Sequence, residues 1–88
     1  MGKYVNMKLE EFRELSLSHR ASILQEEGKY LAKRNSQTFQ VDLYKVYSFY
    51  VEIWNNTIHG ILMDISAFDD EVFLKPYLDG FSISELAN

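Results

Sequence analysis

The sequence of 88 residues contains no cysteine. Disulfide bonds and thiolate metal sites are therefore excluded. Because thiols and disulfides are both missing, the sequence carries no mark of an oxidising compartment, and we expect a cytoplasmic protein.

Long apolar runs are also missing. The longest uninterrupted apolar stretches have a few residues, whereas a transmembrane helix needs about 20. The first residues, MGKYVNMKLEEF, contain no apolar run of signal-peptide length. The single proline and the four glycines are scattered, so no linker divides the chain. We therefore expect one domain over residues 1–88, without a membrane partner.

Positive charge is scarce in the second half of the chain. Residues 1–46 carry eight basic and six acidic side chains, whereas residues 47–88 carry one basic and seven acidic side chains. Nucleic-acid-binding domains present a concentrated basic face. The local basic cluster here is Lys29, Lys33 and Arg34. Three cations make a weak phosphate footprint, so the sequence argues against a nucleic-acid partner.

Apolar residues, in contrast, are plentiful at 47% of the chain, which is enough for a core. The first part of the chain has helical spacing. Residues 8–15, KLEEFREL, place three apolar side chains on one helical face. Ser18 is suited to cap a second helix, and Gly28 is suited to end it. We predict two short helices, or one kinked helix, that end near Gly28.

The middle of the chain alternates between apolar and polar residues, which predicts half-buried strands. The residues Asn35-Ser36-Gln37-Thr38 are typical of a turn, and Asn55-Asn56 can form another. We predict four strands joined as an antiparallel meander: residues 29–34, residues 39–44, residues 49–54, and Thr57 to about Ile65.

The last part of the chain is predicted to be partly helical. The acidic residues 69–71 favour a helix start, and Pro76 would end or kink that helix. A turn at Asp79-Gly80 and a last helical turn capped by Ser84 follow. This segment holds too many apolar side chains for a free tail, so we expect it to fold over the sheet. The predicted fold is α+β: short N-terminal helices, a four-stranded antiparallel β-meander and a short, partly helical C-terminal segment.

A two-residue turn at Asn55-Asn56 would place Glu52 directly opposite His59. In the neighbouring hairpin, the register that keeps the apolar residues of the second strand on the core face pairs Leu43 with Val51, with residues 46–48 as the loop. The same register places Asp42 opposite Glu52.

The row Asp42, Glu52 and His59 has two interpretations. Two adjacent carboxylates and an imidazole could exchange protons or hold a divalent metal ion. The row is also an ordinary polar outer face, in which the Glu–His pair offsets the repulsion between Asp and Glu. The sequence contains no nucleophile motif, glycine-rich loop or second histidine at a recognisable spacing. We therefore favour the second interpretation and assign no catalytic residue, metal or cofactor.

The same predicted face carries Tyr44, Tyr50, Trp54 and Ile61. On a solvated sheet these side chains would form a large apolar patch for a small monomer. Either the C-terminal segment covers the patch or a partner does, and tyrosine and tryptophan are typical interface residues. An open meander also leaves two unpaired edges that can accept another strand. The basic residues at 29, 33 and 34 would protect the first edge.

The chain resembles a type of small, uncharacterised bacterial protein. The matching residues are Leu15, Arg20-Ala21, Leu24, Gly28, Leu31, Leu43-Tyr44, Phe49-Tyr50-Val51-Glu52-Ile53-Trp54 and Pro76-Tyr77-Leu78. The likeness spans most of the chain but includes no catalytic signature. It implies a fold of helices and a meander, and it supplies no activity.

From these features we expect a small non-enzymatic interaction module. Its partner, another protein or a second copy of the chain, would bind the aromatic sheet face or a sheet edge. The alternative is a small hydrolase or metal-dependent enzyme that uses Asp42, Glu52 and His59.

Overall fold

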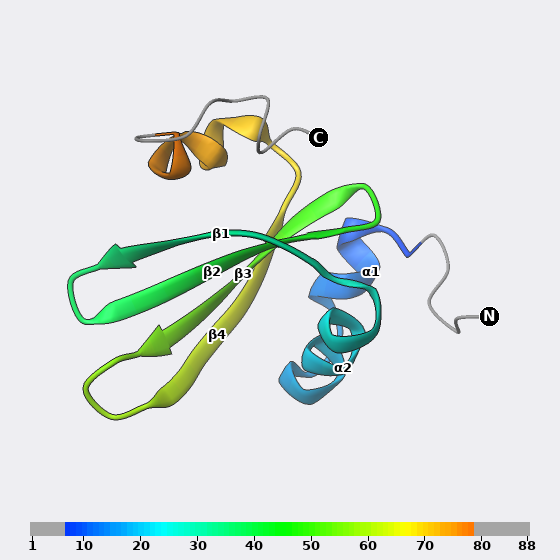
Figure 1. The fold of residues 1–88 in the computed structure, drawn as a ribbon. Helices are drawn as coiled ribbons and strands as arrows, with labels where there is room; N and C mark the ends of the chain where they lie inside the picture. Colours follow the sequence, from blue (N-terminus) through cyan, green and yellow to red (C-terminus); the bar gives the residue numbers. More distant parts are fainter. Residues whose placement is uncertain (1–6, 79–88) are drawn as a thin grey trace.

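The computed structural model describes residues 7–78 and confirms the predicted fold class (Figure 1). The strands form one antiparallel sheet in the order β1-β2-β3-β4. The predictions for Asp79-Gly80 and for the turn capped by Ser84 lie outside the described residues. In chain order the elements are α1 (Leu9–Arg13), α2 (Leu17–Glu27), β1 (Lys29–Ser36), β2 (Phe39–Val46), β3 (Phe49–Asn56), β4 (Ile61–Phe68) and the 3-10 helix η1 (Glu71–Tyr77).

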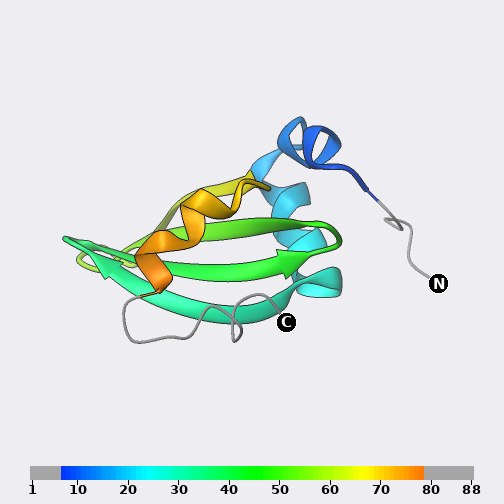
Figure 2. The ribbon, with the colours of Figure 1, turned by 90° about the horizontal axis from the view of Figure 1, so that it is seen from above.

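Both faces of the sheet are covered. Figures 1 and 2 show α1 and α2 on one face and η1 on the other. The helix face buries Phe12 and Ile23 against Val51 and Ile65. The η1 face buries Tyr50 and Leu43 against Leu74 and Tyr77. Adjacent residues of β3 are therefore both buried: Val51 is 0% exposed and Tyr50 is 5% exposed.

The ends of α2 follow local chemistry. The hydroxyl of Ser16, two residues before the predicted cap, accepts a hydrogen bond from the backbone N–H of His19 at 3.2 Å. Gly28 ends the helix as predicted, but with an extended backbone at φ −79°. Glycine fits here because it has no side chain: a Cβ atom at this position would lie 2.7 Å from the carbonyl oxygen of Leu24.

The β2–β3 register differs by one residue from the predicted register. Leu43 pairs with Glu52 and Asp42 pairs with Ile53. Val46 pairs with Phe49, so the loop is the two residues Tyr47-Ser48 rather than three. The prediction assumed that only one face is apolar. Because both faces of this sheet are buried, alternation does not select the register.

The β3–β4 turn was also predicted wrongly. β3 continues through Asn56, and the turn covers residues 57–60 with Gly60 at φ +64°. The Asn56 side-chain oxygen accepts hydrogen bonds from the backbone N–H groups of Ile58 and His59, at 2.9 and 3.0 Å. Asn56 therefore organises the turn that follows it, and Glu52 lies opposite Ser66.

The segment after β4 folds back over the sheet, as expected. Asp70 caps η1 by accepting a hydrogen bond from the backbone N–H of Val72 at 3.0 Å. Pro76 lies inside η1, which ends one residue later at Tyr77. Within residues 7–78, no helix is both long and apolar enough to cross a membrane.

Candidate functional site

The predicted row of Asp42, Glu52 and His59 is not formed. Asp42 is paired with Ile53, next to the pair that contains Glu52, so the two carboxylates point to opposite faces of the sheet. His59 lies in the exposed β3–β4 turn. Across residues 7–78 there is no group of three or more His, Cys, Asp or Glu side chains that could hold a metal ion.

The predicted aromatic surface is divided between several environments. Tyr44 is half-buried and packs against the core on the helix face. Tyr50 is buried on the η1 face and stacks on Phe68 with ring centroids 5.5 Å apart, so the C-terminal segment covers this part of the patch. Trp54 is half-buried, whereas Ile61 at the start of β4 is 54% exposed.

A buried charged cluster lies on the η1 face instead: Arg34, Glu52 and Tyr77. Glu52 is only 8% exposed. Its Oε2 atom accepts hydrogen bonds from the Tyr77 hydroxyl at 2.5 Å and from Arg34 Nη2 at 3.3 Å. The Arg34 guanidinium also lies 5.0 Å from the Trp54 ring centroid and 5.3 Å from that of Tyr77. A buried carboxylate needs such partners, because desolvation otherwise disfavours its charge.

This environment changes the titration of the cluster. Burial, together with the Glu52 carboxylate, raises the pKa of Tyr77 well above its usual value. Burial works against the charge of Arg34, but Tyr77 and Glu52 outweigh it and raise the pKa of that guanidinium. Near neutral pH the cluster therefore holds a neutral phenol and a charged guanidinium.

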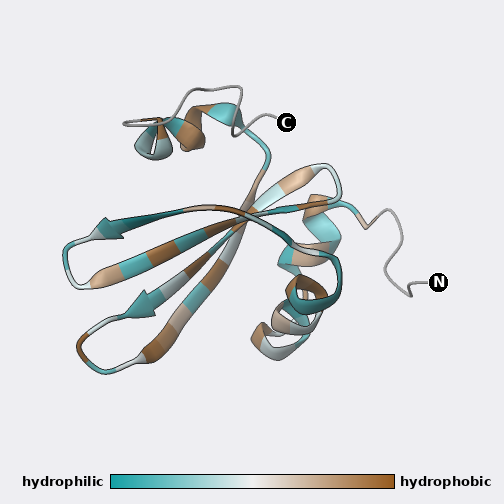
Figure 3. Cartoon of the chain, in the orientation of Figure 1, coloured by the Kyte–Doolittle hydropathy of each residue, from teal (hydrophilic) through white to brown (hydrophobic). Residues whose placement is uncertain are grey.

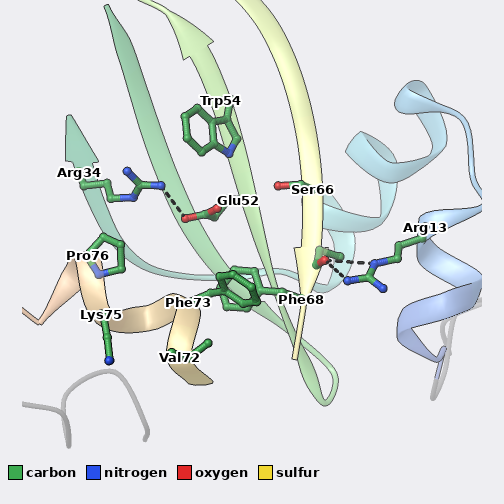
Figure 4. Close-up of a pocket in the computed structure, with 11 residues that line it drawn as sticks. Arg13, Arg34, Glu52, Trp54, Ser66, Phe68, Val72, Phe73, Lys75 and Pro76 are labelled. Atoms are coloured by element: carbon green, nitrogen blue, oxygen red, sulfur yellow. Dashed lines mark hydrogen bonds and ion pairs between the residues drawn. The ribbon is translucent and has the colours of Figure 1, made fainter. Parts of the chain in front are cut away.

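The cluster borders a groove of about 660 Å³ between the sheet and η1 (Figure 4). The walls are mainly apolar and aromatic, and the polar groups come from β1, β3, β4, η1 and α1. The lining residues are Arg13, Arg34, Glu52, Trp54, Ser66, Ala67, Phe68, Val72, Phe73, Lys75 and Pro76.

A second candidate surface is the outer edge of β4. Arg13 donates to the carbonyl oxygen of Ala67 from Nε at 3.2 Å and from Nη2 at 2.8 Å. Arg20 donates from Nη1 to the carbonyl oxygen of Ile65 and from Nε to that of Leu15. Carbonyls two residues apart point to the same side of a strand. The two arginines therefore close the second half of the β4 edge.

The first half of β4 is open. Residues 61–64 are all exposed, whereas Ile65, Ala67 and Phe68 are buried. Figure 3 shows the apolar start of β4 beside an apolar stretch of the β3–β4 turn. Among residues 7–78, no side chain donates a hydrogen bond to the backbone of residues 61–64. The large exposed apolar residues at this end are Ile58, Ile61, Leu62 and Met63.

Sequence reasoning missed most of these features. Glu52 and Trp54 were singled out, but with the wrong neighbours. Arg34 was interpreted as protection of the first edge. The apolar character of the C-terminal segment predicted that the segment containing Tyr77 covers the sheet. It did not predict the hydrogen bond from Tyr77 to Glu52.

The comparisons with family models, with curated proteins and with solved structures find no match to this chain.

Proposed function

We propose that this protein is an interaction module that pairs with a second copy of itself along the open half of β4, residues 61–64. The observation that carries the proposal is the contrast within one edge strand. Two arginines occupy the carbonyls of its second half, while its first half is open and apolar.

The exposed backbone of an edge strand favours a strand as its partner. Unpaired N–H and C=O groups along an edge can form the next ladder of a sheet. Natural edges are commonly protected by lysine, proline, inward-pointing charge or β-bulges. The open half has one irregularity, at Met63, because Trp54 pairs with Asp64 and Asn55 pairs with Leu62, but none of residues 61–64 is a lysine or a proline. At Ile61, Leu62 and Met63 the open half carries apolar side chains instead, with 52% of Met63 exposed.

A second copy of residues 61–64 has the properties that a partner strand needs. Two β4 strands that pair antiparallel about a two-fold axis place residues 61–64 opposite themselves, so each copy supplies the apolar side chains that the other needs. Asp64 adds little repulsion, because its side chain is 58% exposed and its charge is screened by solvent and salt. Leu62 also borders a groove of about 560 Å³ on the helix face, beside Tyr30 and Ile53, where a partner side chain can be received.

A cytoplasmic location and a relation to the small bacterial type that the sequence resembles belong to the same proposal. The absence of cysteine supports the location, and the resemblance supplies no activity. An enzyme that uses Asp42, Glu52 and His59 is not proposed, because these side chains lie apart.

Analytical ultracentrifugation tests self-association. We expect the wild type to form a dimer whose fraction rises with protein concentration, and Ile61→Lys to remain a monomer with an unchanged circular dichroism spectrum. Leu17→Lys is the matched control, because Leu17 is an exposed apolar residue of α2. It should dimerise like the wild type. A wild type that stays monomeric at millimolar concentration, or an Ile61→Lys variant that still dimerises, would contradict the proposal.

A further inference from the structure

The groove between the sheet and η1 has the size and walls of a small-ligand site. Its volume of about 660 Å³ falls in the range of roughly 300–1,000 Å³ that is usual for such sites. Trp54 and Phe68 form the sheet side, and Phe73 and Pro76 form the η1 side (Figure 4). Phe73 is 55% exposed although it lies against Phe68, with ring centroids 5.5 Å apart. A flat apolar body fits between such walls.

The floor of the groove offers a hydrogen-bond acceptor. Glu52 uses Oε2 for both Tyr77 and Arg34, and Oε1 forms no hydrogen bond with any of residues 7–78. A carboxylate can accept about four hydrogen bonds, so Glu52 has capacity left. Ser66 lies directly opposite Glu52 in the β3–β4 register and lines the same groove. A ligand with an N–H or O–H group would complete this set.

The charge of the lining has the opposite sign to that of the protein. Three cations, Arg13, Arg34 and Lys75, border the groove against one anion, Glu52, in a chain whose net charge is −4. Arg34 is compensated by Glu52 at 3.3 Å. The excess therefore comes from Arg13 and Lys75. Both side chains are exposed, so they attract an anion from the mouth of the groove, and salt screens this attraction.

From these three observations we propose that the groove binds a small aromatic anion that carries a hydrogen-bond donor. The aromatic body lies between Trp54 and Phe73, and the donor meets Glu52. The anionic group stays at the mouth of the groove, where Lys75 on the η1 side and Arg13 beyond β4 attract it (Figure 4). This site is independent of the self-pairing proposed for β4, because none of residues 61–64 lines the groove.

A pair of fluorescent probes tests the proposal on the full chain. Anilinonaphthalene sulfonate has an aromatic body, an N–H donor and an anionic group, and N-phenylnaphthylamine lacks only the anionic group. We expect both to bind with saturation and to lower the emission of Trp54, the single tryptophan. The sulfonate should bind about five-fold more tightly at low salt, and this advantage should shrink as salt screens the two cations.

Two variants locate the probe. Phe73→Ser should weaken both probes about ten-fold, because it removes part of an apolar wall. Lys75→Glu should weaken the sulfonate about five-fold and leave the neutral probe unchanged. The matched controls are Ile61→Ser, an exposed apolar residue of β4, and Lys33→Glu, an exposed lysine of β1. Neither control should change binding.

Three results would overturn the proposal. The first is the absence of saturable binding to the wild type. The second is a loss of binding in Ile61→Ser as large as that in Phe73→Ser, which would place the probe on β4. The third is equal affinity for the two probes with no effect of Lys75→Glu, which would show that the groove does not select an anionic ligand. Dimerisation is measured separately, so either proposal can fail without the other.

Discussion

At the scale of single residues, the most informative position is Gln37 in the β1–β2 turn. Its φ of 55° lies in the left-handed region, which costs a residue other than glycine roughly 1–2 kcal/mol. The side chain is exposed, so no packing offsets this cost. The sequence identified the turn through residues 35–38, but it did not show which residue adopts positive φ. That choice depends on the pairing of Ser36 with Phe39, which leaves only two residues in the loop.

Replacing Gln37 with glycine should therefore stabilise the protein. We expect Gln37→Gly to raise the free energy of unfolding by about 0.5–1 kcal/mol, because glycine adopts positive φ freely but also gains entropy in the unfolded chain. Urea denaturation followed by circular dichroism measures the change. Thr38→Gly is the control, since Thr38 does not have a positive φ, and it should not stabilise the protein. A Gln37→Gly variant no more stable than the wild type would contradict this account.

At the scale of elements, local patterns located the helices and strands better than they placed them against one another. Alternation found the four strands because each has apolar residues toward a covered face. It did not determine the β2–β3 register, since Val41 and Val46 are both fully buried although they point to opposite faces. The end of β3 and the start of β4 were missed because Asn56 uses its side chain to build the turn between them.

The attachment of the helices to β4 depends on arginine. Arg20 joins α2 to the carbonyl oxygens of Leu15 and Ile65, and its side chain is 21% exposed. Arg20→Gln removes these bonds and leaves two carbonyls without their donor. We expect the free energy of unfolding to fall by about 1–3 kcal/mol, the usual cost of an unsatisfied buried polar group. The same change lengthens the open edge of β4, so dimerisation should strengthen.

Urea denaturation and ultracentrifugation of Arg20→Gln test both effects. Arg34→Gln is not a suitable control, because it leaves Glu52 unpaired. Lys33→Gln replaces an exposed cation of β1 and should change neither quantity. Unchanged stability in Arg20→Gln would mean that the hydrogen bonds to Leu15 and Ile65 contribute nothing measurable.

At the scale of the whole molecule, the candidate site forms because the C-terminal segment folds back over the sheet, and no local motif encodes it. Arg34, Glu52 and Tyr77 come from three elements, and 25 residues separate Glu52 from Tyr77. No spacing rule links such residues. The sequence did indicate that the apolar C-terminal segment covers the sheet, because its side chains needed burial. The sheet residues that this segment covers depend on the strand register. Because the β2–β3 register was predicted wrongly, the cluster of Arg34, Glu52 and Tyr77 was not predicted either.

The Tyr77–Glu52 contact also sets how the molecule responds to alkaline pH. Burial and the Glu52 carboxylate raise the pKa of Tyr77 above the value of 10.0 for an unperturbed tyrosine. Below about pH 10 both the native and the unfolded chain keep this proton, so its stabilising effect is complete. Above about pH 10 the unfolded chain loses the proton while the native chain keeps it. The free energy of unfolding therefore falls as pH rises, by up to about 1.4 kcal/mol per pH unit.

Tyr77→Phe separates this effect from general alkaline denaturation. The variant should be less stable than the wild type near neutral pH, because Glu52 loses a buried donor. Its stability should then fall less steeply above about pH 10, since one linked proton has been removed. Urea midpoints at a series of pH values measure both slopes. Tyr30→Phe is the control: burial and Asp42 also raise the pKa of Tyr30, but this side chain is half exposed and its contribution should be small. Equal slopes in Tyr77→Phe and the wild type would show that Tyr77 does not govern the alkaline limit.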